Sequence, residues 1–148
     1  MEKAPILQRS IGLILFLLVL LPLTACHPEP VMPQDARVLI INPAAESTIS
    51  SNTITIRTFV ERFNLVDKVG QKSSPGEGHI VFYKDVTPPM KQRKSALSAD
   101  GTYMISTDTS YTWNNVQPGI HTFWVQLVNN DNTPLEPQQA VRVYVTVR

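Results

Sequence analysis

The chain has little of what usually marks a disulfide scaffold, a nucleic-acid binder or a helical protein. Among its 148 residues only Cys26 is a cysteine, so no intramolecular disulfide can form and the fold must rest on core packing. Thirteen basic and twelve acidic residues give a formal net charge of +1. This balance argues against nucleic acid as a partner, because phosphate binding requires a clear basic excess. No window shows a convincing helical stripe of apolar residues.

One long apolar run is present, at residues 11–21, after Lys3 and Arg9 and before Leu23-Thr24-Ala25-Cys26. A basic head, a short apolar segment and small residues before a cysteine are typical of a lipoprotein signal peptide. The run is shorter than the roughly 20 residues that a membrane span needs. We therefore predict a signal peptide over 1–25, a lipid on Cys26 and a location on the extracytoplasmic face of a bacterial or archaeal membrane. The alternative is an uncleaved anchor with an incidental cysteine.

Residues 26–36 are predicted to form a proline-rich tether, because Pro28, Pro30 and Pro33 prevent a helix. Fully extended, about ten such residues reach about 30 Å. The domain is thus held near the membrane without being part of it.

Loss of the leader removes Lys3, Arg9 and Glu2, which leaves eleven basic and eleven acidic residues. A short basic run with Lys91, Arg93 and Lys94 remains within residues 91–94. Its simplest interpretation is a solvated loop, and the alternative is contact with anionic lipid head groups.

In the rest of the chain apolar and polar residues alternate with a period of two. In 140–148 the valines fall on one face and Tyr144 on the other, which predicts a half-buried strand. In 120–128 Phe123, Val125 and Leu127 face inward and Trp124 outward. Further strands are predicted at 37–41, 53–63, 79–86, 102–106 and 111–113, with breaks rich in Pro, Gly, Asn and Ser between them, including 129–137. About seven short antiparallel strands predict an all-β domain over 37–148, an immunoglobulin-like β-sandwich.

Two motifs carry a resemblance. The segments Gly76-Glu77-Gly78-His79-Ile80-Val81-Phe82-Tyr83 and 118–135 (PGIHTFWVQLVNNDNTPL) resemble a family of uncharacterised secreted or lipid-anchored bacterial and archaeal domains, over residues 76–148. The family's first motif usually runs Gly-His-x-His and its second ends Asp-His-Thr-Pro-Leu, whereas this chain has Val81 and Asn132 at the second and third histidines. No activity is established for the family, so the resemblance implies a fold and a compartment only.

The predicted topology places His79 in a possible metal site. Strands 79–86 and 121–128 are expected to be antiparallel neighbours, so His79 should lie near residues 128–132. Together with Asp131 and Glu77 it could then bind a divalent ion such as zinc or copper. The alternative is a structural histidine that caps the strand end by a hydrogen bond to the 129–132 loop. His121 should lie roughly 20 Å away, at the other end of the strands, as a hydrogen-bonded histidine at the edge of the core.

A second candidate site is an aromatic surface. If Ile80 and Phe82 face inward, Tyr83 faces outward beside Trp124 and Tyr144, and three such rings could bind a sugar, a peptide or a partner protein. There are two alternatives. In the first, Val81 and Tyr83 are the core pair, so that Tyr83 faces inward. In the second, the tether or the 67–76 loop covers the three aromatic rings.

No sequence motif of a serine hydrolase, a zinc protease or a phosphate-binding loop is present. We therefore predict no enzyme, but a lipid-anchored binding or structural accessory module of the cell envelope. Its partners would be the membrane, through Cys26, and an envelope protein or glycan. The alternative is a metal-binding module at the His79 end.

Overall fold

The computed structural model describes residues 36–98 and 100–148, which form β-strands joined by turns and loops and contain no helix. The described chain therefore offers no helix with the length and apolarity to cross a membrane. Cys26, the predicted leader and nearly all of the predicted tether lie outside these residues. The strands are β1 (Arg37–Asn42), β2 (Ser47–Ile49), β3 (Ile54–Glu61), β4 (Asn64–Leu65), β5 (Glu77–Lys84), β6 (Tyr103–Ser106), β7 (Ser110–Trp113), β8 (Gly119–Asn129) and β9 (Pro134–Val147).

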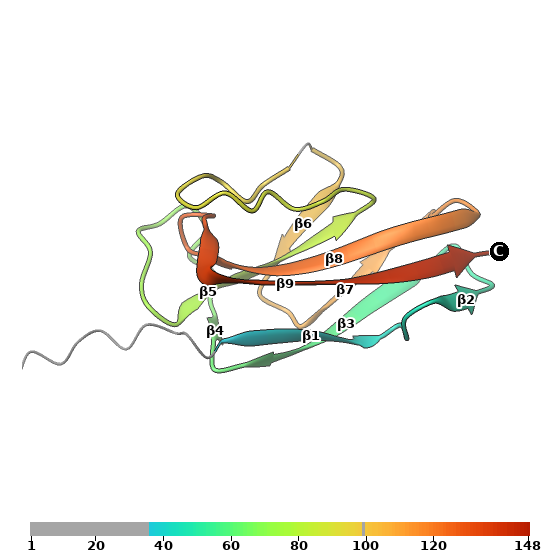
Figure 1. Ribbon diagram of the computed structural model, residues 1–148, viewed down its shortest axis with the longest axis horizontal. Coiled ribbons are helices and arrows are strands. Elements are labelled where there is room, and N and C mark those ends of the chain that lie inside the picture. Colours follow the sequence, from blue (N-terminus) through green and yellow to red (C-terminus); the bar gives the residue numbers. More distant parts are fainter. Residues whose placement is uncertain (1–35, 99) are drawn as a thin grey trace, which may run out of the picture.

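The strands form two sheets (Figure 1). The smaller sheet has the order β1-β3-β7 and is antiparallel throughout. The larger has the order β2-β9-β8-β5-β4, and β6 pairs with β5 as well. Its two shortest strands pair in parallel, β2 with β9 and β4 with β5. The domain is therefore all-β and sandwich-like, with one mixed and one antiparallel sheet.

The main core lies between the sheets and follows the period-two alternation of the sequence. In β9 Val143, Val145 and Val147 are buried, whereas Tyr144 is exposed. Each such branched side chain, once fully buried, contributes roughly 1.5–3 kcal/mol. The buried members of this core are Ala36, Val38, Ile54, Ile56, Ile80, Phe82, Trp113, Val116, Phe123, Val125, Leu127, Leu135, Val143, Val145 and Val147.

Strand β5 is buried on both of its faces. Ile80 and Phe82 belong to the main core, and Val81 and Tyr83 pack in a second cluster on the opposite face. The cover of this second face comes from the segment between β5 and β6, in which Ala96 is completely buried. A strand covered on both sides needs apolar residues at successive positions, which explains the run at residues 80–83.

All the strands predicted from the alternation are present, and β5 and β8 are antiparallel neighbours with His79 opposite Val128. Strands β2 and β4 were not predicted, because three and two residues are too few to show an alternation. Strand β9 begins at Pro134, inside a predicted break. The register with β8 changes at this point: Leu127 pairs with Gln139, but the next residue, Val128, pairs with Pro134. The prolines of this segment therefore mark an irregularity in the pairing and not the end of the strand.

Candidate functional site

An open pocket of about 150 Å³ lies on the outer face of the larger sheet. Strands β8 and β9 form its floor, and the residues that follow β5 form one wall. Its lining contains both charge signs, two aromatic side chains and three hydroxyl groups. The lining residues are Asp85, Val86, Thr87, Thr122, Trp124, Arg142 and Tyr144.

Arg142 stacks against both aromatic rings of the pocket. Its guanidinium carbon lies 5.1 Å from the centre of the Trp124 ring and 5.2 Å from that of the Tyr144 ring. The pairing of β8 with β9 sets Trp124 directly opposite Arg142, and Tyr144 lies two residues further along the same face. Each cation–π contact contributes roughly 0.5–1 kcal/mol at an exposed site. The rings therefore hold a cation in a defined position at an open surface.

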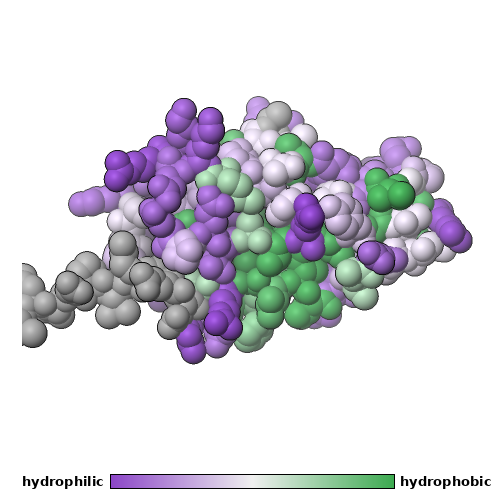
Figure 2. All heavy atoms as spheres, in the orientation of Figure 1, coloured by the Kyte–Doolittle hydropathy of each residue, from purple (hydrophilic) through white to green (hydrophobic). Residues whose placement is uncertain are grey.

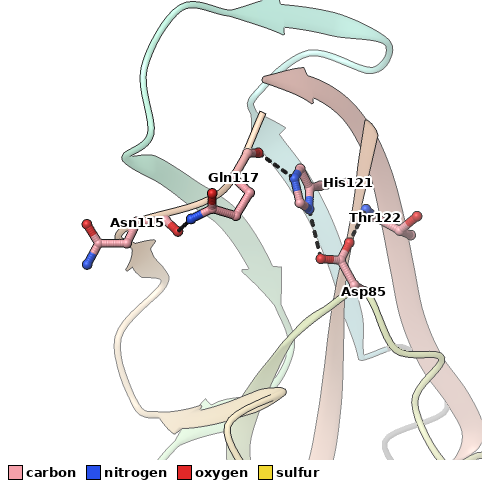
Figure 3. A network of polar contacts seen from close by, with 5 residues as sticks. All are labelled: Asp85, Asn115, Gln117, His121 and Thr122. Atoms are coloured by element: carbon pink, nitrogen blue, oxygen red, sulfur yellow. Dashed lines mark hydrogen bonds and ion pairs between the residues drawn. The ribbon is translucent and has the colours of Figure 1, made fainter. Parts of the chain in front are cut away.

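Asp85 links the pocket wall to the start of β8 (Figure 3). Its carboxylate accepts a hydrogen bond from the Thr122 backbone N–H (3.0 Å) and another from His121 Nδ1 (2.8 Å). The other ring nitrogen of His121, Nε2, donates to the Gln117 carbonyl oxygen at 2.7 Å. An oxygen atom faces each ring nitrogen, so the imidazole is held in a fixed orientation between Asp85 and Gln117. Asp85 has a φ of 58°, in the left-handed region that Asp tolerates better than most residues.

Two of the three residues predicted to form an aromatic surface lie together in the structure, although Trp124 is only partly exposed and packs against the second cluster. Trp124 and Tyr144 line the pocket, and Tyr144 is 40% exposed. Tyr83 is completely buried, so its assignment to an exposed surface is wrong. It does leave β5 on the outer face, but the segment between β5 and β6 covers it.

The Tyr83 hydroxyl is part of the second cluster. It lies 2.8 Å from the Ala96 carbonyl oxygen and 2.8 Å from Oε1 of Gln126. Burial raises the pKa of Tyr83 well above its usual value. This residue therefore fixes the covering segment to the sheet and is not available to a ligand.

The residues predicted as metal ligands have other partners. Glu77 accepts hydrogen bonds from Lys68 Nζ (2.8 Å) and Asn130 Nδ2 (2.9 Å). These two contacts, the lysine first, lower its pKa. Asp131 accepts from the backbone and hydroxyl of Thr133 in the same turn. Within residues 36–98 and 100–148 no three His, Cys, Asp or Glu side chains come together as a group that could hold a metal ion, so the three predicted ligands do not form such a site.

His79 has the structural role that was the alternative to metal binding: it caps the end of the strand by a hydrogen bond to the 129–132 loop. It is completely buried, and its Nε2 lies 3.0 Å from Oδ1 of Asn132. Burial lowers the pKa of His79, against smaller opposing effects of the Asn132 hydrogen bond and the Asp67 charge. The expected hydrogen bond to the 129–132 loop is confirmed.

The turn that joins β8 to β9 connects several loops. The Asn130 carbonyl oxygen accepts from the Gly70 N–H (2.6 Å), and the Asn132 carbonyl oxygen accepts from the Ala96 N–H (2.7 Å). A Cβ on Gly78, in the facing strand, would lie 2.0 Å from the Val128 carbonyl oxygen. Both motifs of the resemblance thus meet here, in a closed arrangement of backbone and amide contacts.

Sequence reasoning missed Arg142 and Asp85 as members of a site. The signal for Arg142 was present, because it shares the outward face of β9 with Tyr144. Asp85 was not singled out, although the predicted pairing of strands 79–86 and 121–128 places the end of the first strand beside His121 at the start of the second. The expected position of His121 at the core's edge, hydrogen-bonded, is confirmed.

The chain matches no family model and no curated protein. Among solved structures it is similar to the crystal structure of an engineered protein, with a TM-score of 0.39 and 14% sequence identity. That match covers 76% of this chain and 20% of the engineered protein, so the chain spans about a fifth of that protein's length.

Proposed function

We propose that this chain is a lipid-anchored binding module of the cell envelope, whose pocket beside Trp124 takes a small polar ligand. The stacking of Arg142 on the Trp124 and Tyr144 rings is the observation that carries the proposal. It puts a positioned cation at the mouth of a concave, partly aromatic site, where a guanidinium can pair with an anionic group of a ligand.

The lining indicates the ligand's chemistry. The exposed Tyr144 ring suits the apolar face of a sugar ring, Arg142 suits a carboxylate, and Asp85 with Thr87 and Thr122 suits hydroxyl or amide groups. A glycan or peptide fragment that carries an acidic group has all three features. The volume of about 150 Å³ fits one ring or one or two amino-acid residues.

Two further assignments belong to this proposal. The order of the strands, with β1 in one sheet and β2 beside β9 in the other, supports an immunoglobulin-like sandwich in which the first strand is shared between sheets. The leader and Leu23-Thr24-Ala25-Cys26 support a lipid on Cys26 and an extracytoplasmic location.

Tryptophan fluorescence tests the pocket, because the chain has two tryptophans and Trp113 is buried in the core. Titration with soluble peptidoglycan fragments, which combine sugar rings with acidic peptides, should change the emission of Trp124. Arg142→Gln and Tyr144→Ser should each weaken the response at least tenfold. An unchanged emission in the wild-type protein, or an equal response in the wild type and both variants, would contradict the pocket assignment.

The anchor is tested separately with Cys26→Ser. The variant should accumulate as an uncleaved precursor without lipid, since the thiol is the site of attachment. A Cys26→Ser protein that is still cleaved after Ala25 and still partitions into detergent would refute the lipoprotein assignment.

A further inference from the structure

The outer face of the smaller sheet exposes a group of apolar side chains. Leu39, Ile41 and Phe59 are 54%, 63% and 53% exposed. Leu39 and Phe59 are direct cross-strand partners, and Ile41 lies at the irregularity that follows in β1. Figure 2 shows hydrophobic residues gathered in the region of β1. Single exposed apolar residues are ordinary, but a contiguous group marks an interaction surface.

Basic residues flank this apolar group. Arg37 and Arg57 are both exposed and lie on either side of it on the same face of β1 and β3. Glu61, opposite Arg37, is the acidic residue of these two strands, and its carboxylate lies 3.9 Å from Arg62. An apolar centre with a basic rim is complementary to an anionic membrane surface.

The chain enters the domain through this same sheet. Strand β1 begins at Arg37, directly after the predicted tether, so the proposed lipid on Cys26 is no more than about 30–40 Å of extended chain away. The anchor would keep the face of β1 at a high local concentration near the bilayer, where a weak additional contact is sufficient to orient the domain.

We propose that the outer face of β1 and β3 seats on the membrane that holds the anchor. Leu39, Ile41 and Phe59 enter the boundary between head groups and acyl chains, and Arg37 and Arg57 contact anionic head groups. This inference rests on the proposed lipid anchor. Because the outer faces of the two sheets point in opposite directions, the pocket on β8 and β9 is turned away from the bilayer toward its ligand.

The experiment uses the full chain reconstituted in vesicles of phosphatidylethanolamine and phosphatidylglycerol. Ile41→Cys and Lys91→Cys are each labelled with an environment-sensitive thiol dye, and a nitroxide quencher is carried on the lipid acyl chains. Lys91 represents the basic run on the segment that covers the opposite sheet, so it is the matched control. We expect blue-shifted, strongly quenched emission from the dye at residue 41 and none of either effect at residue 91.

A second pair of variants tests the patch itself. With the dye at residue 39, the added substitution Ile41→Asp should reduce quenching several-fold, whereas Tyr144→Asp, an exposed position on the other sheet, should leave it unchanged. Equal quenching at residues 41 and 91, or stronger quenching at 91, would overturn the proposal. A blue-shifted emission at residue 41 that the lipid quencher does not reduce would also overturn the proposal. In that case a second copy or a segment of the chain itself would cover the patch.

The same experiment separates this inference from the anchor. If the wild-type protein takes up the thiol dye, Cys26 is free and the lipid assignment fails. If the wild-type protein is unlabelled but residue 41 is not quenched, the anchor stands and the seating of β1 and β3 is wrong.

Discussion

The two ends of the β5–β8 pair each hold a histidine, and they differ in almost every other respect. At one end His79 is completely buried under a turn that is tied to neighbouring loops by backbone and amide hydrogen bonds. At the other end His121 bonds to Asp85 at the border of an open pocket. The ends are separated by seven residues of β8, roughly 23 Å.

The difference shows that histidine and carboxylate content does not identify a site. The His79 end has the richer set of metal-type side chains, yet each of them has a hydrogen-bond partner within the fold. The His121 end has the open volume, and the stacked Arg142 stands beside it. A ligand needs accessible, positioned groups, so the second end is the better candidate for binding.

The largest effect is expected for Gly78→Ala, at the closed end. The new Cβ would lie 2.0 Å from the Val128 carbonyl oxygen and 2.8 Å from the Phe63 ring, so β5 and β8 must separate. We expect a loss of about 3 kcal/mol in the free energy of unfolding, measured by urea denaturation. Gly76→Ala is the control: its φ of 77° is strained for alanine but its surroundings are open, so about 1 kcal/mol is expected. Equal losses would mean that the close approach at Gly78 is not a constraint.

A smaller effect is expected for Asp85→Ala, at the open end. The substitution removes the acceptor of both the Thr122 N–H and His121 Nδ1 and places alanine at a φ of 58°. We expect a loss of about 2 kcal/mol in the free energy of unfolding. Asp85→Asn keeps an acceptor and the tolerance for this φ, so it should lose less than half as much. If Asp85→Asn and Asp85→Ala were equally destabilising, the charge of the Asp85 carboxylate would account for the whole of its interaction with Thr122 and His121.

The pH dependence of stability should distinguish the two histidines. The folded-state pKa of His79 lies below its usual value of 6.5, so the unfolded chain binds more protons between the two values. Stability therefore falls as the pH decreases from about 6.5 toward the folded-state pKa, by at most about 1.4 kcal/mol per pH unit. His79→Gln should remove this slope from thermal unfolding measured between neutral and mildly acidic pH, while His121→Gln should retain it. A slope that persists in His79→Gln would refute a neutral, buried His79.

The smallest effect on stability is expected for Tyr144→Ser. The ring is 40% exposed and contacts Arg142 at the open end, so its loss should change the free energy of unfolding by no more than the cation–π contact, about 0.5–1 kcal/mol. The same variant should nevertheless lose the fluorescence response to the ligand. A large loss of stability would place Tyr144 in the core and reverse the orientation of β9.

Much of the fold was predictable from alternation. The valines of β9 and the inner face of β8 gave correct strands and orientations, because one buried face imposes a period of two on the sequence. The contact between His79 and the 129–132 loop followed from the antiparallel pairing of β5 and β8. The short strands β2 and β4 were not predictable, because they pair in parallel through so few residues that their sequences carry no pattern.

The candidate site was predictable only in part, because the sequence does not show which segment packs over the outer face of the sheet. Alternation correctly turns Trp124 and Tyr144 to the outer face of one sheet, and this much the sequence by itself determined, whereas the unbroken apolar run at 80–83 left the orientation of Tyr83 open. Whether an outward residue meets solvent depends on which distant segment packs over it. The segment that contains Ala96 buries Tyr83 and leaves Trp124 and Tyr144 at an open pocket. That choice belongs to the tertiary structure, because covering a sheet face depends on contacts between residues far apart in the chain, and no local period records them.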